Sequence, residues 1–309
     1  MGFVTGPELA AAVSNAGGLG VMSFSGNPAP VLREEIRRLR CLTDRPFGVN
    51  LILYFPVEDQ VAVCLEERVP VLSLFWGDPA PWVARAHAAG VTMMHQVGSV
   101  AAARRAAAAG VDLIVAQGVE AGGHVEGTVG TMVLVPRVVD AVAPTPVAAA
   151  GGIADARGVV AALALGAQAA VLGTRFLATP EAAAHPLYKE KVVAASEEDT
   201  VHTLLFGSGW PDAPHRVLRT PFVEQWLPEE RRGQEQRPDE PVVGETRMGG
   251  ERVPVARFMS LPPSADTSGD IAAMALYAGQ SAGLVGEVKP AAAIVRELAE
   301  GARRILALM

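Results

Sequence analysis

Between residue 6 and about residue 180, short aliphatic runs alternate with alanine-rich amphipathic stretches, and turns marked by glycine or proline separate them. Aliphatic runs bounded by turn residues predict buried strands, whereas amphipathic stretches predict helices. Strands that alternate with helices in this way predict a parallel sheet whose connections are helical. No other feature of the chain restricts its possible folds so strongly.

The pattern predicts seven strands and seven helices. The expected strands are 20–23, 47–52, 69–74, 92–96, 111–117, 147–150 and 169–172. The expected helices are 6–15, 29–39, 56–67, 79–89, 100–109, 132–142 and 155–165. Several of these helices have proline in the first turn, where its missing N–H costs nothing.

This order indicates an α/β fold of the TIM (β/α)8 barrel type that is short of its first strand, because a closed barrel needs eight strands. Only Met1 to Thr5 precede the first expected helix, too few for a strand and its turn. Either the first strand is a stub, or the natural polypeptide starts roughly 15–20 residues earlier, the length of a strand with its lead-in. An open barrel would leave two unpaired edges.

The alternation stops after residue 178, and we expect a lid-like insertion at 181–266 within a barrel formed by 1–180 and 267–309. The insertion would contain helical and loop segments that cover a substrate. Its stretch 228–251 is polar with charges of both signs, which predicts a solvated loop or an exposed helix. Helical periodicity returns from 270 to 308, with four positions expected to face the core: Ile294, Leu298, Ile305 and Leu308.

Composition excludes several classes of function. The net charge of −7 argues against binding to nucleic acid or to an anionic membrane surface. Two cysteines, Cys41 and Cys64, indicate neither a disulfide framework nor a metal cluster, and they fit a reducing, cytoplasmic location. We see no signal peptide. The longest uncharged stretch, 158–174, is better explained as a helix followed by a strand than as a membrane span.

The most informative local feature is the segment QGVEAGGH, which runs from Gln117 to His124 and follows an expected buried strand. Gly122 and Gly123 would let the backbone approach a flat ligand closely. His124 titrates near neutral pH and could take a proton from a carbon acid. Glycine-rich loops and catalytic groups collect at the carboxyl ends of barrel strands. The alternative is an ordinary turn with a surface histidine.

Two further glycine-rich turns predict a phosphate site. Gly151 and Gly152 follow one expected strand, and Gly173 and Thr174 follow the next. The loops after the last two strands of a barrel often hold phosphate on backbone N–H groups, and a threonine hydroxyl adds a donor. Plain tight turns are the alternative. The segment 18–20 only half matches a dinucleotide-binding loop and leads into a strand, so we interpret it as the end of a helix.

Three amides lie at the ends of expected strands: Asn50, Gln96 and Gln117. An unpaired buried amide costs roughly 1–3 kcal/mol, so each needs a partner. Either a flavin ring or hydrogen bonds within the chain could supply these partners. His95 also stands at a strand end and could line the same site. The other histidines lack metal-ligand spacing, so no metal site is expected.

These residues resemble the nitronate monooxygenases, also called 2-nitropropane dioxygenases. The resemblance covers nearly the whole chain and rests on the segment 117–124 together with six others: Met1-Gly2, 16–20, 48–50, 149–153, 172–176 and 277–283. Members of this family are FMN-dependent α/β barrels that oxidise alkyl nitronates with O2, releasing nitrite and a carbonyl compound.

The resemblance implies a role for each matching residue. His124 would be the catalytic base near the flavin, of most importance for neutral nitroalkanes. Gln117 and Asn50 would hold the flavin ring or the ribityl chain. The implied phosphate cradle is Gly151, Gly152, Gly173 and Thr174, and a segment closing over the cofactor would include Tyr277, Gln280 and Ser281. Met1 and Gly2 match the end of the family's first strand, and this chain departs from the family's pattern in beginning there.

Two other readings stay open at this point. The same fold with FMN could use NAD(P)H, because FMN-dependent enoyl-ACP reductases and some quinone reductases share the EAGGH segment. A barrel without flavin, whose site has decayed, is the third reading. The partners expected are a small nitronate and O2, and the oligomeric state is open, with a homodimer among the possibilities.

Overall fold

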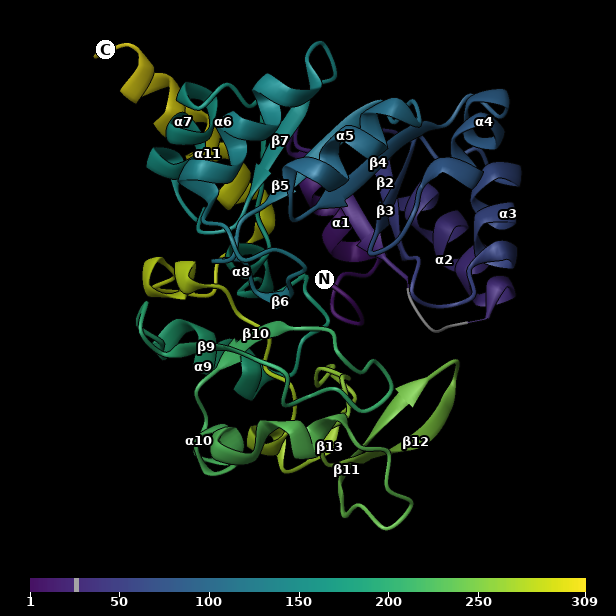
Figure 1. Cartoon of the computed structure of the whole chain (residues 1–309), viewed down its shortest axis with the longest axis vertical. Helices are drawn as coiled ribbons and strands as arrows, with labels where there is room; N and C mark the ends of the chain where they lie inside the picture. The colour runs from purple at the N-terminus through teal and green to yellow at the C-terminus, as the bar shows by residue number, and fades with distance from the viewer. Residues whose placement is uncertain (25–27) are drawn as a thin grey trace.

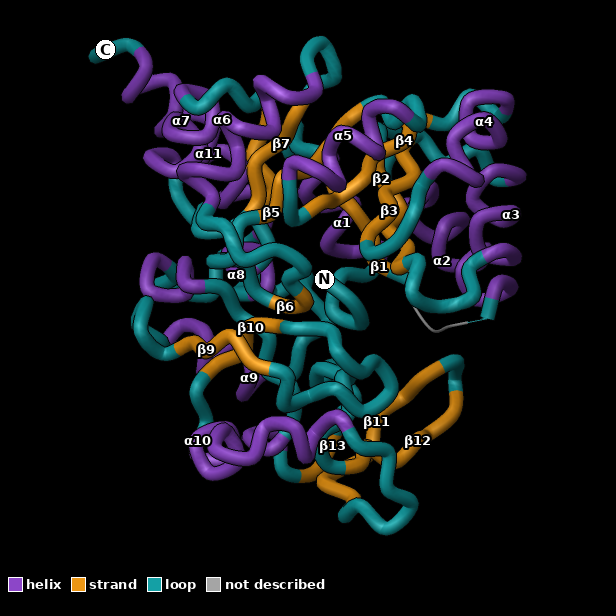
Figure 2. Tube along the Cα trace, viewed as in Figure 1, coloured by secondary structure: helices purple, strands orange, loops and turns teal. Residues whose placement is uncertain are grey.

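A computed structural model describes residues 1–24 and 28–309. Its main element is a curled sheet of seven strands, and every neighbouring pair is parallel (Figures 1 and 2). In spatial order the strands are β1 (Gly20–Ser23), β2 (Phe47–Ile52), β3 (Val71–Phe75), β4 (Thr92–Val97), β5 (Leu113–Gln117), β7 (Val147–Ala150) and β8 (Ala169–Val171). The predicted α/β fold of the TIM-barrel type, with seven parallel strands, is confirmed.

Helices connect these strands as the periodicity predicts. They are α1 (Pro7–Asn15), α2 (Ala29–Leu42), α3 (Glu58–Glu66), α4 (Ala80–Ala88), α5 (Val100–Ala108), α6 (Thr131–Val142) and α7 (Ala156–Ala164). Helix α2 shows the principle, because Leu32, Ile36 and Leu39 recur every three or four residues and are fully buried. Within residues 1–24 and 28–309, no helix is both long and apolar enough to cross a membrane.

The two faces of the sheet have different surroundings. On the outer face, alternate residues such as Leu72 and Leu74 pack with Leu32 and Ile36 of α2 in the largest hydrophobic cluster. On the inner face, Met94, Val115, Ala148 and Ala150 form a small apolar layer. Because successive side chains of a strand point to opposite faces, the residue after each outer one faces inward. This alternation decides which of the polar residues at the strand ends can meet.

The sheet has two edge strands, β1 and β8, among the described residues. The first residues lie between these edges: the Thr5 carbonyl accepts a hydrogen bond from the Ser23 N–H of β1, at 3.2 Å, and Met1 lies beside Gly173. The last helix, α11 (Ala291–Leu306), packs against both α7 and α1. It therefore covers the part of the outer layer between the first and last helices of the alternating region (Figure 1).

A second half of the molecule lies below the curled sheet in Figure 1 and contains two small antiparallel sheets. One comprises β6 (Gly123–His124), β10 (His215–Leu218) and β9 (Thr200–Thr203), and the other β11 (Val242–Met248), β12 (Glu251–Ala256) and β13 (Ser268–Gly269). The helical pieces are α8 (Thr174–Leu177), α9 (Pro186–Ala194) and α10 (Pro221–Trp226), with the 3-10 helix η1 (Leu227–Gln234). The sequence predicts a loop or exposed helix for 228–251. The prediction is wrong for residues 242–251, because β11 pairs with β12 as a hairpin there.

The helical prediction for 270–308 holds only for its second part. Residues 270–290 are irregular apart from the short 3-10 helices η2 (Ile271–Ala273) and η3 (Gln280–Leu284). Ile294 is buried and Leu298 packs beside it, whereas Leu308 is 89% exposed. The prediction for Leu308 is wrong because α11 ends at Leu306, so the helical period no longer places the residue against the core.

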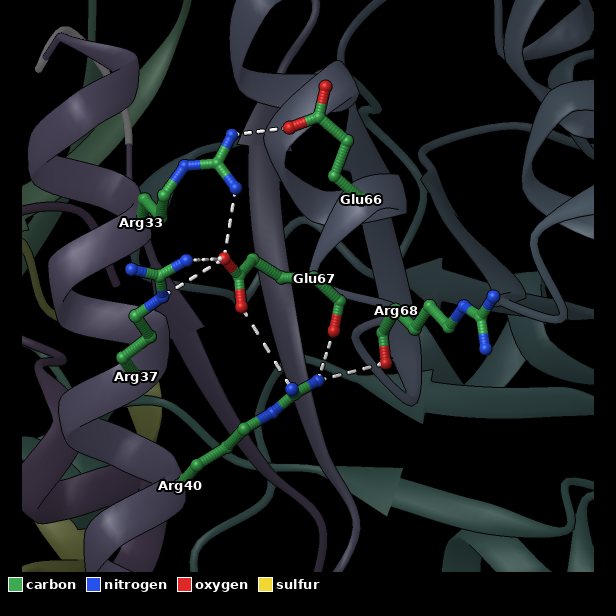
Figure 3. Close-up of polar contacts among 6 residues, drawn as sticks. All are labelled: Arg33, Arg37, Arg40, Glu66, Glu67 and Arg68. Carbon is green, nitrogen blue, oxygen red and sulfur yellow. Dashed lines mark hydrogen bonds and ion pairs between the residues drawn. The ribbon is translucent and has the colours of Figure 1, made fainter.

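An ion-pair network fastens α2 to the end of α3 (Figure 3). The Glu67 carboxylate, whose side chain is 10% exposed, accepts from Arg33 at 2.9 Å and from Arg37 at 2.8 Å. Arg33 also bonds Glu66, and Arg40 donates to the Glu67 carbonyl. All of these groups lie on the outer helical layer, so the network supports the barrel wall and does not belong to the mouth.

Candidate functional site

The three predicted amides all face the inside of the curled sheet. Asn50 lies on the face opposite Val49 and Leu51 of the outer cluster, and Gln96 and Gln117 share their face with inner residues of β4 and β5. Asn50 pairs in register with Ser73, and Gln96 pairs with Phe75. Since the strands are parallel, these side chains lie toward the same end of the sheet.

Hydrogen bonds within the chain satisfy some of the polar atoms of these three amides. Asn50 Oδ1 accepts from the Ser73 hydroxyl at 3.0 Å, and Gln117 Nε2 donates to the His124 carbonyl at 3.1 Å. Gln117 Oε1 is buried and has no hydrogen-bond partner among the described residues. A buried acceptor without a donor is costly, so this atom fits a ligand that brings an N–H group.

Two hydroxyls add to the same end of the sheet, and the sequence reasoning missed both. Ser23 ends β1 on the inner face, and Thr5 lies beside it. Within the described ranges, the hydroxyl oxygens of both residues are buried without a partner. Small hydroxyl residues are common in turns, and nothing in the local sequence distinguishes these two.

His95, which the sequence allowed but did not require in the site, does not line the mouth. It follows Met93 on the outer face of β4 and is 4% exposed. Burial lowers its pKa to about 4. The period of two explains the error, because Gln96 and His95 are neighbours in sequence and point to opposite sides of the sheet.

The loop of residues 118–124 is held from three sides. The Glu120 carboxylate accepts from the N–H and hydroxyl of Thr131, the first residue of α6. The Glu120 carbonyl accepts from the Gln280 N–H at 3.0 Å. Arg216 of β10 is buried and donates two hydrogen bonds to the Val119 carbonyl, at 2.9 and 3.2 Å. The loop is therefore fixed before any ligand binds.

The two glycines of this loop have different reasons for being glycine. A Cβ on Gly122 would lie 2.4 Å from the Gly279 N atom, so Gly122 permits close packing of two backbones of this chain. Gly123 has φ of +76°, and a Cβ there would meet nothing within 4 Å among the described residues. Only Gly123 leaves open space beside the backbone, as the expected approach of a flat ligand requires.

His124 is placed by pairing with β10, where it stands opposite His215. The ring centroids of these two residues are 5.2 Å apart, and the Tyr277 ring lies 5.4 Å from His124. His124 Nε2 is buried without a partner in the part of the chain that the structure describes. Burial, together with the neighbouring His215, lowers the pKa of His124 well below its ordinary value. The imidazole is thus neutral at pH 7, and Nε2 can accept a proton in the tautomer that carries its hydrogen on Nδ1.

His215 is a neutral neighbour of His124 whose ring is held in place by two hydrogen bonds. The sequence assigned it no role beyond a position in the predicted insertion. Its Nδ1 lies 2.9 Å from the Ala213 carbonyl, and its Nε2 accepts from the Phe206 N–H at 3.1 Å. These contacts require the proton on Nδ1, and burial lowers the pKa to about 4. His215 therefore orders the environment of His124 and has no free nitrogen for proton transfer.

Two tryptophans beside His124 were also missed. Trp210 stacks on the imidazole with centroids 3.9 Å apart and an interplanar angle of 21°. Trp76 meets the same imidazole edge-on at 6.2 Å and has a left-handed φ of 60°. Strained backbone of this kind collects at functional sites. Trp76 directly follows β3, a position that could have been found, whereas Trp210 lies far from any strand end of the sheet.

The predicted phosphate cradle divides into two parts. Gly151 and Gly152 have φ of +104° and +71°, and a Cβ on Gly151 would lie 3.0 Å from the Gly118 carbonyl oxygen. The chain's own packing therefore accounts for Gly151. Gly173 has an ordinary φ of −108°, and the nearest atom to a Cβ there, among the described residues, is Met1 Sδ at 3.7 Å. The space beside Gly173 suits the close approach of a ligand.

The remaining predicted residues lie around the same end of the sheet. Thr174 accepts from the Gly279 N–H at 3.0 Å, which ties α8 to the segment 277–283. The Tyr277 hydroxyl donates to the Ser260 carbonyl, Ser281 is buried and Gln280 is exposed. Met1 packs near Gly173, and a Cβ on Gly2 would meet nothing within 4 Å among the described residues.

No cluster of metal-ligating side chains occurs within residues 1–24 and 28–309. The chemical resources of the site are therefore a neutral imidazole, an unpaired amide oxygen, hydroxyls and glycine-lined backbone. These groups suit proton transfer beside an organic ring that offers donors of its own.

Comparison with known proteins identifies the family of the chain. The sequence profile of the family described as "Nitronate monooxygenase" matches residues 1–56 and 54–301. A nitronate monooxygenase of Pseudomonas aeruginosa is 34% identical over 349 aligned positions, which cover 97% of this chain and 93% of that protein.

A second relative bears a different name. The (3aS,4S,5R,7aS)-5-hydroxy-7a-methyl-1-oxo-octahydro-1H-indene-4-carboxyl-CoA dehydrogenase of Mycobacterium tuberculosis is 39% identical over 228 residues. That alignment covers 73% of this chain, and the chain spans only 63% of the length of that relative.

Two solved structures share the whole fold. FabK from Thermotoga maritima superposes with a TM-score of 0.82 at 38% identity, covering 100% of this chain and 92% of the other. A nitroalkane oxidase from Streptomyces ansochromogenes superposes with a TM-score of 0.83 at 32% identity, covering 100% and 95%. With a family profile that spans nearly all of its length and a nitronate monooxygenase aligned almost end to end, this chain belongs to the nitronate monooxygenase family.

Proposed function

We propose that the protein is an FMN-dependent oxidoreductase that oxidises alkyl nitronates, and nitroalkanes through their nitronates, with O2 to a carbonyl compound and nitrite. The observation that carries the proposal is the state of His124. Its imidazole is buried and neutral, with Nε2 unpaired among the described residues, at the mouth of the sheet where Gln117 Oε1 is also unpaired. A general base for a carbon acid needs this combination of a free nitrogen and a neutral ring.

The residues present fit FMN. Gln117 Oε1 would accept from an N–H of the isoalloxazine ring, and Asn50 and Gln96 would add amide contacts on the same inner face. Gly123 leaves space for a flat ring, and Gly173 with the neighbouring Gly152 would cradle the phosphate. When bound, FMN supplies the electron acceptor that nitronate oxidation requires and returns the electrons to O2.

The chain's own residues have three tasks. His124 removes the carbon-bound proton of a neutral nitroalkane and is less important for a substrate that arrives as the anion. The bonds of Arg216 and Glu120 hold the 118–124 loop so that the imidazole keeps one position. Trp210 and Tyr277 cover the ring and keep water away from it. We further propose that 181–266, which carries Trp210, acts as the lid of a barrel made of 1–180 and 267–309.

A second candidate function is that of an FMN-dependent NAD(P)H oxidoreductase, of the enoyl-ACP reductase or quinone reductase type, on the same fold. It is favoured by the similarity to FabK and to the mycobacterial carboxyl-CoA dehydrogenase, which are slightly more identical to this chain than the nitronate monooxygenase is. The near end-to-end alignment with the nitronate monooxygenase supports the first candidate.

The deciding experiment uses the flavin-loaded protein under anaerobic conditions. It is mixed with the nitronates of nitroethane and 2-nitropropane, and separately with NADH and NADPH, while flavin absorbance is followed. We expect rapid bleaching by a nitronate, and release of nitrite once air is admitted. Bleaching by a reduced nicotinamide with none by any nitronate would select the reductase. Protein that stays colourless after addition of FMN would contradict both candidates.

A further inference from the structure

Trp210 is stacked on the candidate base as part of a column of three rings. The indole stacks on the imidazole of His124, with ring centroids 3.9 Å apart, and on the ring of Tyr54, at 5.2 Å, and it is inclined by 21° to each. Trp76 meets the indole edge-on at 5.0 Å. Trp210 is carried by the second half of the molecule, so a residue far from the curled sheet in sequence completes the surroundings of its base.

The indole N–H is the unexplained part of this column. Trp210 is 2% exposed, and its Nε1 has no hydrogen-bond partner among the described residues. His124 Nε2 is unpaired in the same way. Buried indole N–H groups ordinarily find an acceptor. A donor and an acceptor on two stacked rings, both without partners, form a pair that one small ligand can satisfy.

We propose that Trp210 is a catalytic residue whose indole N–H donates to the substrate oxygen that becomes negative as His124 takes the proton. This inference rests on the proposed function. In the step, the C–H bond next to the nitro group breaks, its proton goes to His124 Nε2, and the electron pair of that bond delocalises onto the nitro oxygens. Charge that develops on oxygen in a water-poor site is stabilised by a fixed donor.

The proposal separates two roles that a large aromatic residue could have. Stacking alone would position the imidazole, and any flat ring would supply it. Donation requires the N–H group. The role as donor also predicts a difference between substrates, because a neutral nitroalkane acquires oxygen charge only in the transition state, whereas a nitronate already carries it when it binds.

The test compares Trp210→Phe with a variant that carries 3-benzothienylalanine at position 210, which keeps the bicyclic shape and lacks the N–H. We expect both to lower kcat with neutral nitroethane by about 10²–10³-fold, the usual effect of losing one oxyanion donor. With ethyl nitronate, the expected change is mainly a higher KM. Trp210→His, which restores a ring N–H, should recover part of the lost kcat. If the benzothienyl variant keeps the wild-type kcat with nitroethane, the proposal is overturned.

Trp226→Phe is the matched control. Trp226 ends α10 in the same half of the molecule, where the Arg257 guanidinium lies 4.7 Å above its ring and Phe258 meets it edge-on at 5.2 Å. Its replacement should leave turnover unchanged. Flavin content and thermal unfolding show whether each variant is folded. The acid limb of the pH profile should be the same in Trp210→Phe as in the wild type, because the phenyl ring still covers His124.

A second measurement does not depend on turnover. The chain has four tryptophans, so flavin-loaded protein labelled with 15N-tryptophan gives four indole N–H resonances, and Trp210→Phe assigns the one from Trp210. Nitrite, used as a small oxyanion probe, should move this resonance and leave that of Trp226 in place. A Trp210 resonance that nitrite does not move would overturn the proposal even if nitronates are substrates. If nitrite moves the resonance but the protein oxidises no nitronate, the indole N–H of Trp210 still donates to an oxyanion. The proposed reaction is then rejected.

Discussion

At the scale of single residues, burial sets the chemistry of His124. The ring is enclosed by Trp210, His215 and Tyr277, and desolvation disfavours its charged form more than any other influence. The residue is therefore a base that is ready at neutral pH. Its neighbour His215, equally buried, differs because both of its nitrogens are occupied.

Replacement of this base gives the first prediction. We expect His124→Ala to lower turnover of neutral nitroalkanes by about 10²–10⁴-fold, the usual contribution of a positioned base. Turnover of preformed nitronates should fall much less, and FMN should stay bound. Steady-state nitrite release with both forms of each substrate, with flavin content as a control, measures this. Unchanged turnover of the neutral form would exclude His124 as the base.

The pH dependence follows from the direction of the pKa shift. His124 acts when deprotonated, and its folded pKa lies well below 6.5. Activity with a neutral nitroalkane should therefore persist at pH 6.5 and fall only as the pH drops through the lowered pKa. Initial rates at low nitroethane concentration, between pH 4.5 and pH 8, give kcat/KM directly. A limb at or above pH 6.5 would mean that the imidazole is more hydrated than its surroundings indicate.

At the scale of elements, the contact between α2 and the end of α3 depends on one carboxylate. Glu67 accepts from Arg33 and Arg37 while nearly enclosed (Figure 3). We expect Glu67→Ala to reduce the free energy of unfolding by about 1 kcal/mol, the upper range for an exposed pair, because several charges share the group. Urea unfolding at 0.05 and 0.5 M salt tests this.

The control for this prediction is Glu58→Ala, which removes a single exposed pair with Arg85. Its effect should be smaller. The loss in Glu67→Ala should shrink at high salt, because ions screen the interaction in the wild type. A loss that is equal at both salt concentrations would point to lost packing of the Glu67 side chain.

Strand β10 carries a pH-dependent contribution to stability through His215. The pKa of this residue is about 4 in the folded chain and 6.5 in its ordinary state. Between these values the unfolded chain binds more protons, so stability is complete above pH 6.5 and is lost as the pH falls toward 4. The shift corresponds to about 3 kcal/mol. Unfolding in guanidinium at pH 7 and pH 5 should show a smaller pH effect in His215→Gln than in the wild type.

At the scale of the whole molecule, two halves of different architecture meet at the 118–124 loop. The curled sheet contributes its three amide side chains, including that of Gln117. The small sheet β6–β10–β9 contributes His215 and Arg216. The segment 277–283 passes between them and is tied to Glu120 and Thr174. A ligand at this junction would contact both halves and should stabilise the molecule as one unit.

Thermal unfolding with and without FMN tests this expectation. A ligand present at 100 times its Kd stabilises the folded state by about 2.7 kcal/mol, which for a chain of this length is a rise in Tm of about 4 °C. At the same concentration as FMN, riboflavin, which lacks the phosphate, should raise Tm less if Gly152 and Gly173 hold that group. Equal shifts of Tm with both compounds would show that Gly152 and Gly173 do not bind the phosphate.

The sequence by itself determined the curled sheet. Strands β1, β2 and β7 have the predicted bounds, and α1, α5 and α6 begin or end within one residue of theirs. These elements repeat their apolar residues with a local period, so neighbouring residues are enough to predict them. The sequence also predicts that the glycine-rich loop and His124 follow a buried strand, and they follow β5. Their role in catalysis stays a prediction.

Only the tertiary structure decided what surrounds His124 and which polar atoms lack partners. His215, Trp210 and Arg216 reach the site through the pairing of β6 with β10, a contact between residues about 90 positions apart. The hairpin β11–β12 was missed because its exposed polar residues carry no apolar period. Local periodicity reports which face of an element is buried. Which distant side chain covers that face depends on packing between elements, and no local pattern records it.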